Sequence, residues 1–128
     1  MRLLLSLMGA ILMATPLPAQ AARVDQEARI AKALAGRVPG KPVSCIPQYT
    51  VQSSEIFDGT AILYKAGSTW YLNRPEIGKE FLRRDYMMVT NTHSSDLCSI
   101  DIVRLVDNAS HFPVGSLGLG KFVPYRKP

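Results

Sequence analysis

Apolar positions follow two different patterns along this chain. An unbroken apolar run, Leu3–Ala14, opens the sequence, whereas short apolar stretches separated by turn residues follow from Pro42 onward. Between these two regions, Ala22–Ala35 places Ile30 and Leu34 four residues apart, as one face of a helix requires. The pattern therefore predicts a short helix that precedes a domain built mainly from strands.

The predicted helix, Ala22–Ala35, has a start and a stop. Asp25 can cap its first turn, because a side-chain oxygen can accept hydrogen bonds from the free amides there. Asp25 and Arg29 stand four residues apart in the order that favours an ion pair. Gly36 ends the helix, and Ala31 and Ala35 extend its small apolar face. A helix this short is marginal alone, so it must dock on the rest of the domain.

Alternation and β-favouring side chains predict the strands. The predicted strands are Val43–Ile46, Tyr49–Phe57, Thr60–Lys65, Thr69–Asn73, Tyr86–Thr90, Ile100–Val106 and Lys121–Tyr125. Asp58-Gly59 suits a two-residue hairpin turn, and Ala66–Ser68 turns the chain again. The three strands around these turns are therefore predicted to form a meander.

The remaining segments are predicted to be loops, with one helical turn over Lys79–Arg84. Asn91–Asp96 is polar, and His111–Gly120 carries Pro113 and three of the nine glycines. Lys121–Tyr125 is predicted to be an edge strand because Pro124 lacks an amide donor. The fold class is mainly β (α+β): a small antiparallel, curled sheet of five to six strands with a short N-terminal helix.

The first 21 residues have the order of features typical of a secretory signal peptide. Arg2 precedes the 12-residue run Leu3–Ala14, Thr15–Pro18 breaks that run, and Ala19-Gln20-Ala21 forms a small-x-small cleavage site. A buried helix of a cytosolic domain would explain the apolar run but not this order. We therefore expect residues 1–21 to be a cleaved leader and residues 22–128 to be one exported domain, periplasmic or extracellular, with no membrane span after cleavage.

Cys45 and Cys98 are the only cysteines. An even number of cysteines in an exported chain predicts a disulfide, which would close a loop of 54 residues and stabilise the domain by about 4 kcal/mol. A buried pair of free thiols and a metal site are the alternatives, and the absence of a C-x-x-C spacing argues against zinc. We expect neither a metal nor a cofactor.

Charge adds little to this picture. Removal of Arg2 with the leader leaves 14 basic against 10 acidic residues, net +4. The basic residues are scattered, apart from Arg83-Arg84 and Arg126-Lys127, so no nucleic acid partner is expected. An envelope protein or an anionic envelope polymer remains a possible partner.

Candidate catalytic chemistry is confined to the region His93–Asp101. His93, Ser94 and Asp96 supply a base, a hydroxyl and a carboxylate, although a nucleophilic triad needs these groups to converge in space. Their proximity in sequence is also ordinary turn chemistry. A metal site would draw on His93, His111, Asp96 and Asp101, but no pair among them has the spacing of a metal motif.

Two further patterns have competing interpretations. Gly115–Gly120 is glycine-rich but lacks the G-x-G-x-x-G spacing of a dinucleotide site, so a flexible turn is expected. Tyr64, Trp70 and Tyr71 lie on neighbouring predicted strands, where they either pack the core or line a face that binds a sugar ring or a partner. Core packing is the favoured interpretation.

Five short stretches together carry a resemblance. They are Cys45-Ile46-Pro47, Asp58-Gly59-Thr60-Ala61-Ile62, Tyr71-Leu72-Asn73-Arg74-Pro75, Leu97-Cys98-Ser99 with Asp101, and Leu119–Tyr125. The chain resembles a family of small exported proteobacterial proteins of unknown function over roughly Pro42–Tyr125. The resemblance implies an envelope location and transfers no catalytic or binding residue.

The sequence therefore favours a non-catalytic accessory or interaction domain of the bacterial envelope. No convergent catalytic set supports an enzyme, and no catalytic residue is assigned. A small envelope hydrolase that uses the His93–Asp101 region is the first alternative. A binder of a small ligand or polysaccharide on an aromatic sheet face is the second. An enzyme predicts a pocket with a perturbed titratable group, whereas a protein partner predicts an exposed apolar patch or an unpaired sheet edge.

Overall fold

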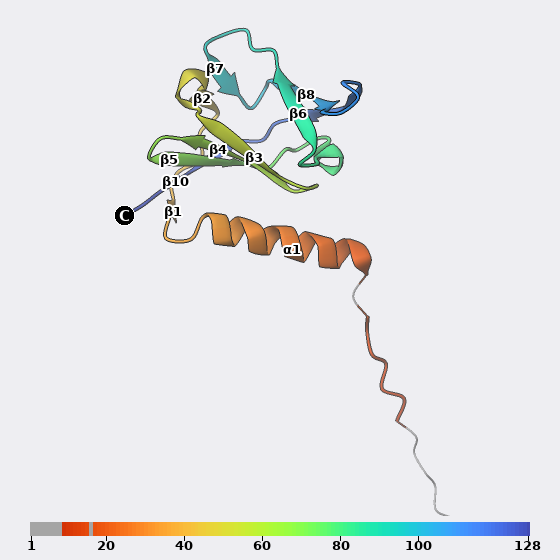
Figure 1. Cartoon of the computed structure of the whole chain (residues 1–128). Coiled ribbons are helices and arrows are strands. Elements are labelled where there is room, and N and C mark those ends of the chain that lie inside the picture. The colour runs from red at the N-terminus through yellow and green to blue at the C-terminus, as the bar shows by residue number, and fades with distance from the viewer. Residues whose placement is uncertain (1–8, 16) are drawn as a thin grey trace, which may run out of the picture.

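The computed structural model describes residues 9–15 and 17–128 of the chain. Part of the predicted leader, namely residues 1–8 and Pro16, lies outside the described residues. One helix, α1 (Pro18–Ala33), crosses beneath a stack of three antiparallel sheets (Figure 1). The predicted class, mainly β with an antiparallel sheet and an N-terminal helix, is confirmed.

The largest sheet, sheet A, has five strands in the order β1-β10-β5-β4-β3. Its strands are β1 (Val38–Pro39), β3 (Ser53–Phe57), β4 (Ala61–Ala66), β5 (Thr69–Asn73) and β10 (Phe122–Arg126). The meander β3-β4-β5 matches the prediction. Its first turn holds three residues instead of two, because Phe57 pairs with Ala61 and leaves Asp58, Gly59 and Thr60 between them.

Two smaller sheets lie over one face of sheet A. Sheet B pairs β2 (Cys45–Pro47) with β7 (Asp96–Cys98), and sheet C has the order β6-β8-β9. The strands of sheet C are β6 (Tyr86–Thr90), β8 (Ile102–Asp107) and β9 (Pro113–Gly118). Two 3-10 turns, η1 (Gln48–Thr50) and η2 (Lys79–Phe81), complete the regular elements.

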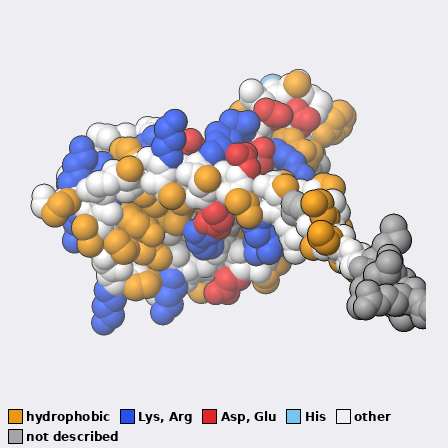
Figure 2. Space-filling model, turned by 90° about the horizontal axis from the view of Figure 1, so that it is seen from below, with side chains coloured by type: hydrophobic (Ala, Val, Ile, Leu, Met, Phe, Trp, Pro, Cys, Tyr) orange, Lys and Arg blue, Asp and Glu red, His pale blue; other side chains and the backbone are white. Residues whose placement is uncertain are grey.

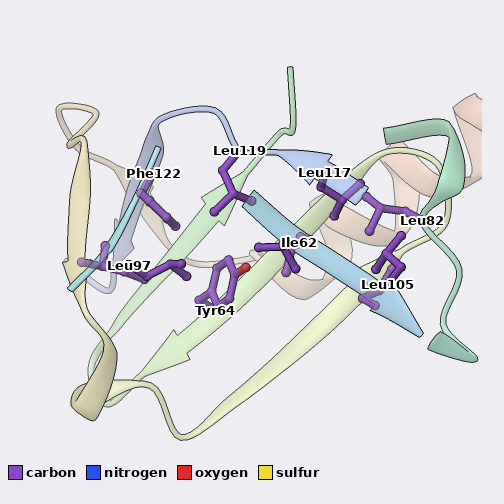
Figure 3. Close-up of a cluster of buried hydrophobic side chains, with 11 residues drawn as sticks. Ile62, Tyr64, Leu82, Leu97, Leu105, Leu117, Leu119 and Phe122 are labelled. Atoms are coloured by element: carbon purple, nitrogen blue, oxygen red, sulfur yellow. The ribbon is translucent and has the colours of Figure 1, made fainter. Parts of the chain in front are cut away.

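Strand β4 contributes side chains to two separate hydrophobic clusters because its side chains alternate between the faces of sheet A. Ala61 and Leu63 pack toward Ile30 of α1 and toward Leu34, the residue that follows the helix. Ile62 and Tyr64 point to the opposite side, into a larger cluster with side chains of the smaller sheets (Figure 3). The central strand of the meander thus links the two halves of the core.

The helix begins earlier and ends earlier than predicted. Pro18 occupies its first turn, where a proline fits because the first amides have no partner within the helix. Asp25 consequently lies inside the helix and does not cap it, which corrects the prediction. Leu34 caps the C-terminal end, and Gly36 follows with a φ of 79°.

Several strand boundaries also differ from the prediction. The predicted strand Val43–Ile46 begins and ends later, as β2 (Cys45–Pro47). Val43 forms only an isolated bridge with Phe122. The N-terminal part of the predicted strand Tyr49–Phe57 is a 3-10 turn. The predicted helical turn at Lys79–Arg84 is present, as the shorter η2.

The C-terminal strand β10 was expected at an edge and lies inside sheet A, between β1 and β5. It tolerates Pro124 because the carbonyl of that residue accepts the amide of Gly40, on the side where β1 has already ended. The missing donor of Pro124 faces the same side, so no bond to β5 is lost.

A buried asparagine at the end of β5 is hydrogen-bonded to the turn before β10. The side chain of Asn73 is fully buried, and its Nδ2 donates to the carbonyl of Gly120 at 2.7 Å while its Oδ1 accepts the amide of Gly120 at 3.0 Å. Both polar atoms are therefore satisfied, as burial requires. Two of the five stretches that carry the family resemblance meet at this contact.

Candidate functional site

A groove of about 620 Å³ separates sheet A from sheet C between β3 and β6. Its volume lies in the range of ligand-sized sites. Ten residues of five segments line it: Val51, Ser54, Glu55, Ile56, Tyr64, Arg84, Tyr86, Met87, Met88 and Thr90.

Both walls of the groove are edge strands. Strand β3 is the last strand of sheet A, and β6 is the last strand of sheet C. Among the described residues, neither strand has a strand neighbour on the side away from β4 or β8. Backbone amides and carbonyls along an unpaired edge are available to another extended chain.

The groove is bounded at both ends by hydrogen bonds. At one end, the amide of Arg84 donates to Oδ1 of Asp58 at 2.8 Å, and the amide of Gly59 donates to the carbonyl of Leu82. At the other end, Thr92 Oγ1 donates to Gln48 Oε1 at 3.3 Å. Because β3 approaches the first end and β6 departs from it, the two strands run in opposite directions across the groove.

The floor of the groove is apolar with one polar group. Ile56 and Tyr64 are buried, and Val51 and Met88 are half-buried against the same cluster. The ring of Tyr64 meets Phe122 edge-on, with centroids 5.8 Å apart (Figure 3). Burial raises the pKa of the Tyr64 phenol, so its hydroxyl stays neutral and able to donate and accept hydrogen bonds.

The rim of the groove is polar and mixed in charge. Ser54 is exposed and Thr90 is half-buried at opposite walls. Glu55 forms an ion pair with Lys65 at 3.5 Å, and Arg84 lies 4.0 Å from Asp58. The rim thus carries charges of both signs.

The structure does not bring the residues of the hydrolase hypothesis together. His93 is exposed in the loop before β7. Ser94 Oγ accepts the amide of Asp96 at 3.2 Å, which is a local turn contact. Asp101 Oδ2 accepts the amide of Cys98 at 2.7 Å and so closes the turn after β7. These polar side chains shape turns, and no hydrogen bond links His93 to a hydroxyl in the described part of the chain.

Metal chemistry has no cluster to support it either. Within residues 9–15 and 17–128, no group of three or more His, Cys, Asp or Glu side chains gathers around a common point. The two cysteines instead form the disulfide Cys45–Cys98, directly opposite each other on β2 and β7, as predicted.

The aromatic residues do not share one binding face, which corrects the idea that Tyr64 and Trp70 line a common surface. Tyr64 points into the cluster below the smaller sheets, whereas Trp70 packs on the helix side of sheet A. The Arg37 guanidinium lies 3.8 Å from the Trp70 ring centroid, and Lys65 Nζ lies 4.7 Å from it. These cations cover part of the ring in cation–π contacts.

The glycine-rich segment is a packing surface and not a flexible turn. Residues 113–118 form β9, which corrects the predicted loop. A Cβ added at Gly115 would lie 2.9 Å from the Phe81 ring, and one added at Gly120 would lie 2.4 Å from the carbonyl oxygen of Arg74. The glycines therefore let the segment 74–81 lie directly against β9 and the turn that follows it.

The charged surface shows no dense basic face in the view of the helix side. Lys and Arg side chains are spread over this face and Asp and Glu side chains lie among them (Figure 2).

No helix within the described residues is long and apolar enough to cross a membrane.

Sequence analysis missed the groove because it depends on strand order. The one available indication was β6, where Met87, Met88 and Val89 are all apolar and therefore place hydrophobic side chains on both faces of the strand. Such a strand is covered on both sides or exposes an apolar surface. In the structure, Met88 packs on the core while Met87 and Val89 are exposed.

Comparison with family models, curated proteins and solved structures found no match to this chain.

Proposed function

We propose that the mature domain is a non-catalytic interaction domain of the bacterial envelope, which binds an extended segment of a partner protein in the groove between β3 and β6. The observation that carries this proposal is that the groove is lined by two strands, β3 and β6, each of which has an unpaired edge within the described residues. An extended peptide is the occupant that suits two such edges, because it presents backbone donors and acceptors on both of its sides.

The geometry defines the chemistry of this peptide. Each wall offers five residues of strand, which corresponds to roughly 17 Å of extended chain. Alternate side chains of the bound peptide would face the floor formed by Val51, Tyr64 and Met88 and should be apolar. The intervening side chains would face solvent. Because β3 and β6 run in opposite directions, the peptide would pair in antiparallel fashion with one wall and in parallel fashion with the other.

The location of the protein is part of this proposal. The disulfide Cys45–Cys98 is consistent with an oxidising compartment, where such bonds persist. The features of residues 1–21 and the resemblance to small exported proteobacterial proteins support the periplasm or the extracellular space. A cut after Ala21 would also leave the docking residues of α1 in place, because Gln26, Ile30 and Leu34 all follow it.

The test uses three forms of the mature protein as bait in envelope extract: wild type, Ser54→Arg and Ser53→Arg. Ser54 lines the groove, whereas its neighbour Ser53 is exposed and does not line it, so the second variant is a matched control on the same strand. We expect the partner to be captured at least about tenfold less by Ser54→Arg than by the other two baits, which corresponds to about 1.4 kcal/mol.

Quantitative mass spectrometry of the captured proteins and the melting temperature of each bait provide the measurements. Equal capture by wild type and Ser54→Arg, with equal melting temperatures, would contradict the groove as the binding surface. Equal loss of capture by both variants would place the partner elsewhere on β3.

A further inference from the structure

A second hollow, of about 450 Å³, lies between the start of α1 and the turn after β3. Ala22, Arg23 and Gln26 line it from the helix, together with Ala19 of the predicted leader. Asp58, Gly59, Thr60, Glu80 and Arg83 line it from the body of the domain. The hollow is thus placed where the predicted leader meets the mature domain.

Gln26, on the helix wall of this hollow, carries a buried acceptor that is unsatisfied within the described residues. Its side chain is 9% exposed, and its Oε1 is buried without a hydrogen-bond partner in the described part of the chain. A buried oxygen of this kind costs free energy unless a donor reaches it. Long side chains on a helix lean back toward the preceding turn, and Ala22 stands four residues before Gln26 on the same helix face.

Two carboxylates face the same hollow. Asp58 uses Oδ1 to accept the amide of Arg84, and its Oδ2 lies 4.0 Å from Arg84 Nε. Glu80 has no side-chain hydrogen bond in the described part of the chain, since the nearby Arg83 donates to the carbonyls of Glu80 and Leu82. The hollow therefore holds two carboxylates, of Asp58 and Glu80, and two guanidinium groups, of Arg23 and Arg83.

We infer that this hollow binds the α-ammonium group of Ala22, which cleavage after Ala21 creates. This inference rests on the proposed export of the chain. Before cleavage, the amide of Ala22 lies within α1, and the first turn of the helix holds no acidic residue. Cleavage removes the leader and with it the first four residues of the helix, 18–21. The amide of Ala22 becomes an ammonium group with three donors, which would lie beside Gln26 Oε1.

Cleavage also changes the electrostatics of the helix start. The amides of Arg23, Val24 and Asp25 lose their acceptors, because the carbonyls of residues 19–21 leave with the leader. Asp25 then belongs to the first turn of the shortened helix, where a carboxylate is stabilised by the helix dipole and offsets the new positive charge. Three carboxylates thus surround the mature terminus: that of Asp25 on the same helix and those of Asp58 and Glu80 across the hollow.

A cycle of four mature proteins tests this inference. Two begin at Ala22, with Gln26 or with Gln26→Met, which keeps the length of the side chain and removes its acceptor. The other two carry Gly-Ser before Ala22, which keeps an ammonium group but moves it away. We expect the Gln26 protein that begins at Ala22 to melt at least about 4 °C above its extended form, and this difference to vanish in the Gln26→Met pair.

An extension that leaves the melting temperature unchanged or raises it would overturn the inference, and this comparison needs only the wild-type side chain. The intact mass of the protein recovered from its native envelope separates this result from the test of export. A mass that begins at Ala22 without the expected difference overturns the binding of the ammonium group alone. A mass that retains the leader, or that begins elsewhere, overturns the proposed processing and this inference with it.

Discussion

Helix α1 and the two small sheets cover opposite faces of sheet A, and they cover them to different extents. On the helix side, one continuous element places Ile30 and Leu34 over Phe57, Leu63 and Leu72. On the other side, strands of sheets B and C contribute five side chains to the cluster that holds Ile62: Ile46, Leu97, Val103, Leu105 and Leu117. The larger cluster is the more deeply buried, yet its cover leaves the groove beside β3 open.

This difference follows from how the covering elements are built. A helix pairs its backbone donors and acceptors internally, so it leaves no unpaired edge wherever it ends on a sheet. Sheet C instead covers sheet A only as far as its last strand, β6, which has an unpaired edge within the described residues. Where β6 and β3 fail to pair, both edges remain. The side that is covered by sheets therefore contains the groove that we propose as a binding surface, whereas the side that is covered by the helix buries the smaller cluster.

The largest expected effect sharpens this contrast. Phe122 is fully buried in the larger cluster, so Phe122→Ala should lower the free energy of unfolding by about 3–5 kcal/mol. Leu34 lies at the end of α1 with 7% of its surface exposed, so Leu34→Ala should cost only about 2 kcal/mol. Urea unfolding of both variants measures the two values. A larger loss for Leu34→Ala would mean that the helix contributes more stability than the small sheets.

The second prediction concerns the disulfide that closes sheet B, whose two strands have only three residues each. Reduction of Cys45–Cys98 should lower the free energy of unfolding by about 3–4 kcal/mol and the melting temperature by about 10 °C or more. Calorimetry with and without reductant, with thiol titration to verify reduction, gives the measurement. An unchanged melting temperature after complete reduction would show that Ile46 and Leu97 hold sheet B without the bond.

The smallest effect concerns the surface contact that joins α1 to sheet A. Glu27 pairs with Arg74 through two hydrogen bonds, of 2.6 and 3.0 Å, and the hydrogen bond from Arg74 lowers the pKa of Glu27 from its ordinary value of 4.5. Both side chains are almost half exposed, so Glu27→Gln should cost only about 0.5 kcal/mol at pH 7.

The pH dependence of that effect has a definite sign. Because the folded pKa is depressed, the stabilisation is complete above pH 4.5 and is lost as the pH falls through the lower folded value. Wild type and Glu27→Gln should therefore differ at neutral pH and converge in acid. Denaturation curves across this pH range check the point, and a difference that persists in strong acid would assign it to packing of the side chain.

The same contrast explains which parts of the fold the sequence predicts. The meander β3-β4-β5 joins neighbours in sequence through short turns, so residues such as Asp58-Gly59 and the β-favouring Thr69–Asn73 indicate it locally. Strand β9 carries Gly115 and Gly118 and has little intrinsic preference for a strand. It forms because β8 and the segment around Ile77 pair with it, and no local pattern reports that.

The candidate site was harder to predict for a related reason. Alternation shows that Tyr64 and Ile62 share a face, but it does not show that β3 ends its sheet and that β6 ends another. The hydrolase hypothesis drew on sequence proximity between His93 and Asp96, which the structure uses for turns. The groove depends on contacts between Asp58 and Arg84, 26 residues apart, and between Gln48 and Thr92, 44 residues apart.

The close approach of the segment 74–81 to β9 limits how this protein can change over evolution. A Cβ at Gly78 would lie 2.1 Å from the carbonyl oxygen of Ser116, and Gly78 also has a φ of 79°. Here two backbones meet with no side chain between them, so a substitution at the glycine cannot be compensated by a smaller residue on the partner, whose contacting atom is a backbone oxygen. Divergent sequences with this fold should therefore keep glycine at Gly78 and Gly120 while the residues around them vary.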